Sequence, residues 1–142
     1  MEILLVEKDP LVRDRVKVGL QQFPEFTVTV GDSYLGVNEL RQRAFDCVFL
    51  GVDPRDQDSM LLLQHLRSFD MATELVVMTP LRSLKDMQSF KSRYNITAFL
   101  QTPIDLKEYF GFLGRFLERR TDRKQSQVRK GQKAPAGAGR GR

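Results

Sequence analysis

The 142-residue sequence contains no tryptophan, one cysteine and one histidine. Because Cys47 is alone, no disulfide can form within the chain, and a structural zinc ion lacks its usual set of ligands. No apolar run approaches the roughly 18 residues that a membrane span needs. The N-terminus also lacks the basic stretch and long apolar segment of a signal peptide. We therefore expect a cytoplasmic protein without a membrane span.

Positive charge is concentrated at the C-terminus. Residues 119–142 contain nine Lys or Arg and one acid, a net charge of +8, which leaves −3 for residues 1–118 out of the total of +5. Hydrophobic periodicity ends near Arg119, and Gly, Ala, Pro, Gln, Lys and Arg make up the last twelve residues. A segment of this composition cannot bury enough apolar surface to fold. We predict a domain at residues 1–119 and a basic, disordered tail at residues 120–142.

Short apolar runs alternate with amphipathic stretches up to residue 119. The run at 47–50 has no polar alternation, which is typical of a central strand that is buried on both faces. Alternation of strands and helices predicts an α/β fold with a parallel sheet and helices on both faces. The expected strands are 3–6, 26–30, 47–50, 75–78 and 98–100, and the last two helices are expected at about 83–94 and at 106–119.

Ligands and chemistry gather at the carboxyl ends of the strands in a sheet of this kind. The residues that directly follow the predicted strands are therefore the candidates for a site. They are Glu7 to Asp9, Gly51 to Asp53, Thr79, and Gln101 to Pro103.

These strand ends resemble the receiver domains of response regulators, and the resemblance covers about residues 2–119. It implies a CheY-like, flavodoxin-like (βα)5 fold with strand order 2-1-3-4-5 and a part in bacterial two-component signalling. It also implies a cis peptide bond before Pro103. Five motifs carry the resemblance, in the family's order: Val6-Glu7-Lys8-Asp9-Pro10, Phe45 to Gly51, Asp58-Ser59-Met60, Val76 to Thr79, and Phe99 to Pro103.

The sequence departs from the family at the residues that carry its chemistry. Gly51 stands where the family has its phosphoacceptor aspartate, Lys8 replaces the second acid of the metal-binding pair, and Thr102 replaces the lysine. Only Glu7 and Thr79 remain of the usual pocket. An aspartyl phosphate needs a carboxylate nucleophile, and magnesium is normally bound through carboxylates, waters and phosphate oxygens. We therefore expect that this pocket has lost both magnesium binding and phosphorylation, and that the protein has no cofactor.

The sequence allows two roles for each of several residues near the predicted pocket. Lys8 either pairs with Glu7 or Asp53 and holds the strand-end loops together, or points into solvent. Asp53 is a displaced acceptor in one interpretation, although its loop position beside Pro54 argues against that role. The resemblance assigns switch roles to Thr79 and Phe99, whereas the alternatives are a structural hydroxyl and a half-buried strand residue.

The last predicted helix has two apolar stripes. We expect the first, Leu106, Phe110, Leu113 and Leu117, to face the sheet, since these positions recur at helical spacing. A second stripe lies roughly 100° away and consists of Tyr109, Phe112 and Phe116. It predicts either an interface with another protein or with a second copy of the chain, or a broad core face.

The leading functional hypothesis is a phosphorylation-independent, receiver-like adaptor that recognises another protein. One alternative is a phosphorelay regulator with a shifted acceptor at Asp53. The other is a nucleic-acid-associated protein whose tail neutralises phosphates, against a tail that only improves solubility. An enzyme with a small-molecule substrate is not expected, because the Glu7-Lys8-Asp9-Pro10 loop has no glycine with which to cradle a nucleotide phosphate.

Overall fold

The computed structural model describes the backbone of residues 1–133 and the side chains of residues 1–120. Within that part of the chain, no helix combines the length and the apolar character that a bilayer crossing requires. The chain divides into two units, Met1–Leu106 and Lys107–Arg142. The first unit contains the sheet and all but the last helix.

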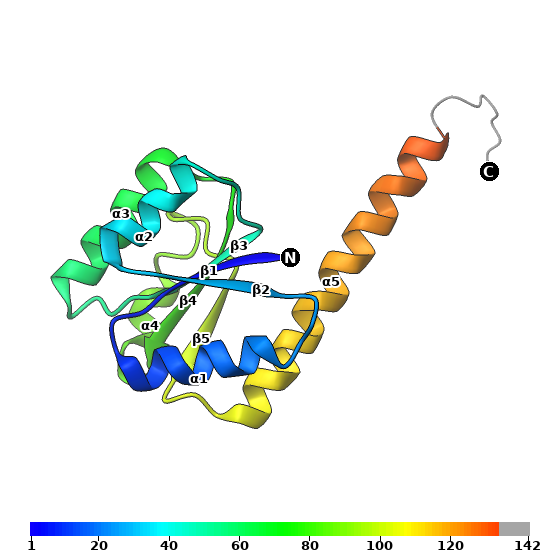
Figure 1. Cartoon of the computed structure of the whole chain (residues 1–142). Helices are drawn as coiled ribbons and strands as arrows, with labels where there is room; N and C mark the ends of the chain where they lie inside the picture. Colours follow the sequence, from blue (N-terminus) through cyan, green and yellow to red (C-terminus); the bar gives the residue numbers. More distant parts are fainter. Residues whose placement is uncertain (134–142) are drawn as a thin grey trace. The chain divides into compact units, whose positions relative to one another are not determined.

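A five-stranded sheet forms the centre of the first unit (Figure 1). Its order is β2-β1-β3-β4-β5 and all of its neighbouring strands are parallel, so the predicted fold is confirmed. Most strands extend further at their carboxyl ends than the apolar runs alone predicted. The strands are β1 Glu2–Val6, β2 Thr27–Gly31, β3 Cys47–Gly51, β4 Glu74–Pro80 and β5 Ala98–Thr102.

Helices follow each strand. Asp9 and Asp56 begin α1 and α3 by accepting hydrogen bonds from backbone amides of the first turn, as N-cap residues do. Helix α4 is shorter than predicted, and the turns after it close at Asn95 in the expected left-handed conformation (φ 50°). The helical segments are α1 Pro10–Gln21, α2 Ser33–Asn38, η1 Glu39–Arg41, α3 Gln57–Phe69, α4 Leu81–Gln88 and α5 Leu106–Lys133.

The sheet is buried on both faces, as the unbroken apolar strands predict. Leu4 and Val6 of β1 belong to a hydrophobic cluster with side chains from α2, α3 and α4, while Leu5 between them is also fully buried. Figure 1 shows α1 on the opposite side of the sheet from α2 and α3. The central strands β1, β3 and β4 are therefore shielded along most of their length, whereas the edge strands β2 and β5 are partly exposed.

Backbone contact between β2 and α2 requires two glycines. A Cβ atom on Gly31 would lie 2.7 Å from the Cα of Gly36, and a Cβ atom on Gly36 would lie 2.6 Å from the Cα of Gly31. Any larger residue at either position would separate the strand from the helix. The close approach fixes the loop that leads from β2 into α2.

Helix α5 is longer than predicted. It runs from Leu106 to Lys133, so the expectation that residues 120–133 are disordered was wrong. These residues have no apolar stripe, but Arg, Lys and Gln dominate them, and such residues have high intrinsic helix propensity. This propensity is consistent with a helix that continues past Arg119. The rest of the predicted tail, residues 134–142, lies outside the described residues.

Both stripes of α5 contribute to its buried side, which agrees with the broad core face that was the alternative for the second stripe, whereas the expectation that all of the first stripe faces the sheet was wrong. Tyr109 and Phe116 are each only 1% exposed, whereas Leu106 and Phe110 are 47% and 38% exposed. Leu113 is fully buried, so the buried side of this helix centres on Tyr109, Leu113 and Phe116. Helical spacing identified both stripes correctly, but aliphatic character alone did not decide which one is buried.

A buried arginine fastens the C-terminal end of α3. The guanidinium of Arg67, which is 6% exposed, donates hydrogen bonds to the carbonyl oxygens of Asp70, Tyr94 and Asn95 at 2.8, 2.7 and 2.9 Å. Burial lowers the pKa of Arg67, although Asp70 opposes this shift. One side chain thus joins α3 to the segment that leads into β5.

Replacement of Arg67 by Met should lower the free energy of unfolding by about 3 kcal/mol, because three carbonyls would lose a charged donor. Urea denaturation of the Arg67→Met variant would measure the change. Lys91→Met, at an exposed position, is the matched control and should change stability little. Equal stability of the two variants would contradict this role for Arg67.

Candidate functional site

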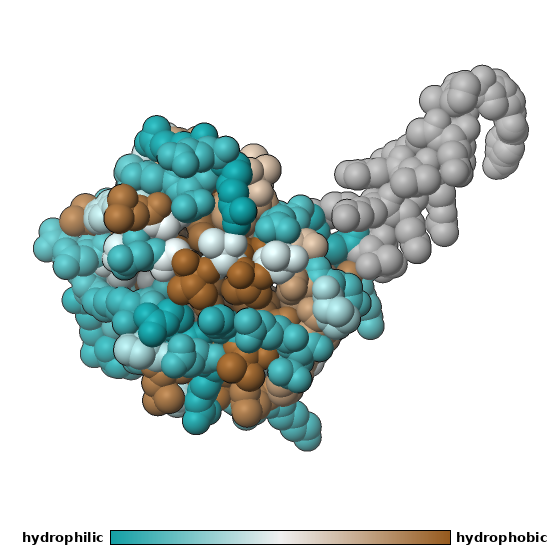
Figure 2. Space-filling model, viewed as in Figure 1, coloured by the Kyte–Doolittle hydropathy of each residue, from teal (hydrophilic) through white to brown (hydrophobic). Residues whose placement is uncertain are grey.

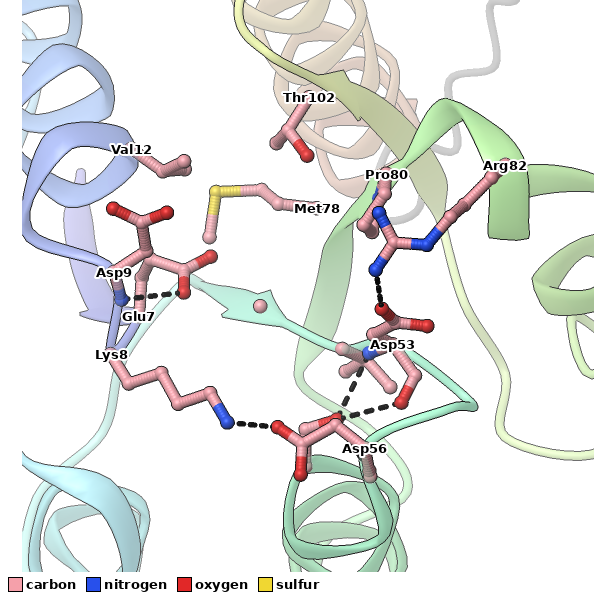
Figure 3. Close-up of a pocket in the computed structure, with 13 residues that line it drawn as sticks. Glu7, Lys8, Asp9, Val12, Asp53, Asp56, Met78, Pro80, Arg82 and Thr102 are labelled. Atoms are coloured by element: carbon pink, nitrogen blue, oxygen red, sulfur yellow. Dashed lines mark hydrogen bonds and ion pairs between the residues drawn. The ribbon is translucent and has the colours of Figure 1, made fainter.

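A pocket of about 330 Å³ opens at the carboxyl ends of the strands (Figure 3). Residues that directly follow or end β1, β3, β4 and β5 surround it, as expected for this type of sheet. Apolar side chains form part of the wall, and four carboxylates and two basic groups complete it. The lining residues are Glu7, Lys8, Asp9, Val12, Gly51, Val52, Asp53, Asp56, Ser59, Met78, Pro80, Arg82 and Thr102.

Glu7 occupies the space beside Gly51. A Cβ atom built on Gly51 would lie 2.2 Å from Oε1 of Glu7 and 2.6 Å from its carboxyl carbon, distances at which atoms overlap. The carboxylate from β1 therefore fills the volume into which a side chain at the end of β3 would project. An aspartate at this position cannot be accommodated unless Glu7 moves.

The carboxylate of Glu7 is partly shielded from water. Burial raises the pKa of Glu7, and the negative charge of Asp9 acts in the same direction, although the amide of Asp9 donates a hydrogen bond to Oε2 at 3.0 Å. Figure 3 shows the carboxylates of Glu7 and Asp9 on the same side of the pocket, near the thioether end of Met78. This part of the site combines negative charge with apolar surroundings.

Lys8 forms an ion pair with Asp56, which was not one of its two predicted partners. The contact raises the pKa of Lys8 and lowers that of Asp56. Because the Lys8 side chain is 70% exposed, solvent screens this attraction and the pair contributes little to stability. It nevertheless joins the loop after β1 to the start of α3, so the hypothesis that Lys8 links two loops is retained with a different partner.

Asp53 is held by contacts on both carboxylate oxygens. Oδ1 accepts a hydrogen bond from the Ser83 hydroxyl at 2.7 Å, and Oδ2 accepts one from the Arg82 guanidinium at 2.9 Å. Partial burial opposes ionisation of Asp53, but hydrogen bonds from the Arg55 amide and from Ser83, together with the charge of Arg82, hold its pKa below the ordinary value. Asp53 therefore ties the loop after β3 to the first turn of α4.

Of the remaining predicted pocket and switch residues, Thr102 lines the pocket, whereas Thr79 and Phe99 do not. Thr102 lines the pocket, and the peptide bond between Thr102 and Pro103 is cis, as predicted. Thr79 is fully buried but does not line the pocket, since its neighbours Met78 and Pro80 do so on the other face of the strand. Its hydroxyl has no hydrogen-bond partner in the described part of the chain. Phe99 is half-buried against the core cluster, in agreement with its structural interpretation.

The predicted interface on the last helix is not available as a whole. Tyr109 and Phe116 are buried, and burial also raises the pKa of the Tyr109 hydroxyl. Phe112 is half-buried and stacks on Phe116, with ring centroids 5.9 Å apart. The aromatic stripe therefore agrees with a core role, and an aromatic docking surface composed of these three residues was the wrong interpretation.

The pocket does not fit the magnesium ion that this fold family would imply. Asp56 is paired with Lys8, both oxygens of Asp53 accept other hydrogen bonds, and the space beside Gly51 is filled by Glu7. Among the described residues, no group of three or more His, Cys, Asp or Glu side chains could hold a metal ion. The carboxylates of the pocket are thus engaged by protein groups rather than directed at one point.

Sequence reasoning missed Val12, Asp56 and Arg82 among the lining residues, and also Ser83, which holds Asp53 from outside the lining. Asp56 is the N-cap of α3, and its position just before a helix was a readable signal. Arg82 and Ser83 begin α4, a helix whose predicted start lay two residues too late. A correct helix start would have placed Arg82 at the edge of the pocket and Ser83 within reach of Asp53.

Gly51→Asp should destabilise the protein by about 1 kcal/mol, because the new side chain displaces the flexible end of Glu7 and adds a like charge beside it. The double variant Glu7→Ala/Gly51→Asp should recover about half of this loss, since it removes the overlap. Denaturant unfolding of the two single variants, the double variant and the parent chain forms a double-mutant cycle. Additive effects would show that Glu7 and Gly51 do not share this space.

The contacts of Asp53 predict an acid-sensitive part of the stability. Its pKa is lowered by folding, so its contribution is complete above the ordinary aspartate value of about 3.9 and is lost as pH falls through the folded-state pKa. The difference in unfolding free energy between the parent chain and Asp53→Asn should therefore shrink from about pH 6 to about pH 3. Asp14→Asn, an exposed carboxylate on α1, is the control. A constant difference would contradict the assignment.

The sequence matches no protein-family model and no curated protein. Solved structures, in contrast, share the fold. A CheY-like response regulator receiver domain protein from Methanospirillum hungatei JF-1 is 17% identical, with a TM-score of 0.66 over 86% of this chain and 97% of that chain. NtrX from Brucella abortus is 21% identical, with a TM-score of 0.71 over 91% of this chain and 29% of that chain.

A third similar structure is described as a novel family of redox sensors in the streptococci that evolved from two-component response regulators. It is 16% identical, with a TM-score of 0.70 over 88% of this chain and 54% of that chain. At such low identities the likeness is one of fold. The chain therefore has the fold of CheY-like response regulator receiver domains.

Proposed function

We propose that this chain is a pseudo-receiver, a module that recognises another protein in two-component-type signalling without accepting a phosphoryl group. The observation that carries the proposal is the end of β3, where Gly51 has no side chain and the carboxylate of Glu7 fills the space beside it. A phosphoryl acceptor needs a nucleophilic atom that is open to the donor. The shared receiver fold supports the signalling role.

Internal contacts support an arrangement of the pocket that does not depend on phosphorylation. The pair of Lys8 with Asp56 joins the loop after β1 to the start of α3. The contacts of Asp53 with Ser83 and Arg82 join the loop after β3 to α4. Together they orient the strand-end loops through contacts within the protein, so that the surface presented to a partner does not depend on a phosphoryl group.

Asp53 as a shifted acceptor is the weaker candidate. It lines the pocket, but both of its carboxylate oxygens accept hydrogen bonds, which oppose nucleophilic attack because they stabilise the ionised ground state. Nucleic-acid binding by residues 119–142 remains a third candidate, on the strength of their net charge alone. The side chains from residue 121 onward lie outside the described part of the chain.

We further infer that the module is not an enzyme and has no small-molecule substrate. The pocket contains no histidine, cysteine or serine–histidine pair that could act as an activated nucleophile. Cys47 is fully buried in β3, which argues against thiol chemistry as its signal. A cytoplasmic location stays a prediction.

Incubation of the full chain with acetyl phosphate and magnesium should leave its intact mass unchanged, because no accessible acceptor is available. A receiver domain that retains its aspartate is the positive control and should gain the mass of one phosphoryl group. An adduct on the parent chain that disappears in Asp53→Asn would favour the shifted acceptor. An adduct that persists in that variant would also contradict the proposal.

A further inference from the structure

Strand β2 forms an open edge of the sheet. Within the described residues it pairs with β1 on one side and with no strand on the other. The amide of Thr27 donates a hydrogen bond to the carbonyl of Met1 at 2.8 Å, so the odd-numbered residues of β2 direct their backbone groups at β1. Because this direction alternates along a strand, the amides and carbonyls of Val28 and Val30 point away from the sheet. None of the hydrogen bonds found in residues 1–120 reaches these outer groups.

The composition of β2 leaves this edge unprotected. Exposed sheet edges usually carry charged residues, proline or a bulge, which prevent pairing with a further strand. The strand Thr-Val-Thr-Val-Gly contains no charge and no proline, and its register with β1 continues without a bulge. Val30 is 41% exposed. Figure 2 shows hydrophobic and neutral atoms in the middle of the face that β2 crosses, with hydrophilic atoms above and below them.

The order of residues in β2 suits a second copy of the same strand. A valine is the first neighbour of Thr29 in both directions along the chain. In an antiparallel pair centred on Thr29, Val28 of each copy lies opposite Val30 of the other copy, and the two Thr29 residues face each other. The outward backbone groups of each Val28 and the opposite Val30 can then exchange hydrogen bonds in both directions. Two copies related by a twofold axis require this kind of self-complementary surface.

The charged groups near the centre of such a pair are already paired within the chain. The guanidinium of Arg43 donates a hydrogen bond to the Thr29 hydroxyl at 2.5 Å and forms an ion pair with Glu39 at 3.8 Å. Each copy would therefore bring an acid together with its arginine to this place. Like charges directly opposite each other destabilise paired strands, and β2 itself contributes none.

We propose that two copies of this chain associate through antiparallel pairing of their β2 strands, so that one sheet continues into the other. This association goes beyond the proposed function, which specifies neither self-association nor this edge. Each copy uses the same surface, so the assembly closes at a dimer. A single short strand buries less area than a standard interface, and we expect a dissociation constant on the order of 100 µM. No residue of β2 lines the candidate pocket, which stays open in both copies.

Sedimentation equilibrium of the full chain tests the association, after nuclease treatment and in about 500 mM salt, which screens attraction through the basic segment 119–142. We expect the weight-average mass to rise with concentration toward twice the mass of the chain and no further, because backbone pairing tolerates salt. A chain that stays monomeric up to about 1 mM would overturn the proposal and would leave the edge to an extended segment of a different protein. Growth beyond a dimer would overturn it as well.

Two variants change the edge and a third serves as their control. Val30→Lys places a charge opposite an apolar residue of the second copy and should weaken association at least about tenfold. Val28→Pro removes an outward amide that the chain does not use internally, so it should weaken association equally while the fold tolerates it. Leu61→Lys places the same charge on α3 at a residue of similar exposure, 43%, and should leave association unchanged. Variants of the edge that melt like the parent chain and still form dimers equally well would refute the proposal.

A cysteine at the twofold centre tests the register independently. Thr29→Cys brings two thiols together in a non-hydrogen-bonded pair with Cα atoms about 4.5 Å apart, which a disulfide can span. Thr27→Cys is the matched control, since the two copies of residue 27 would lie roughly 14 Å apart. Mild oxidation and non-reducing electrophoresis should yield a cross-linked dimer for Thr29→Cys only, because Cys47 is fully buried in the parent chain. Absence of this dimer, or equal cross-linking of the two variants, would rule out the pairing.

Discussion

The contact between Glu7 and Gly51 is the constraint on which the pocket depends. Because a carboxylate from β1 lies where a β3 side chain would project, the third strand contributes only backbone at its end. The carboxylates of the site come instead from Glu7 and Asp9 after β1 and from Asp53 and Asp56 in the segment after β3.

The pocket has four carboxylates and two basic side chains, so its two ion pairs neutralise only part of its negative charge. Two ion pairs connect neighbouring loops, and both include at least one well-exposed side chain, so they orient the loops more than they stabilise the protein. The apolar strands provide the stability, since the sheet is buried on both faces. The fold therefore tolerates a rearranged site at its edge without a change in its core.

The sheet could be predicted from the sequence, because unbroken apolar runs specify buried parallel strands and their alternation with helices restricts the topology. The cis bond before Pro103 was implied by the resemblance to receiver domains, and the lack of a side chain at Gly51 could be read directly. The position of the Glu7 carboxylate could not, since it depends on a side-chain conformation across two strands. The ion pair between Lys8 and Asp56 could not be predicted either, because it depends on how close the loop after β1 comes to the start of α3. The length of α5 was missed because the prediction followed apolar periodicity, which ends near Arg119, and gave no weight to the helix propensity of the basic residues beyond it.

The two ends of the strands in the first unit are held by contacts that differ in burial, and the guanidinium of Arg67 makes the buried ones. It fastens the far end of α3 to the residues that enter β5 through three carbonyl oxygens in a buried setting. At the opposite ends of the strands, solvent-exposed ion pairs perform the corresponding task. Thermal opening will therefore begin around the mouth of the pocket, while the other end acts as a rigid base. In such a protein the loops around the pocket can change conformation on binding while the packing of the hydrophobic core stays the same.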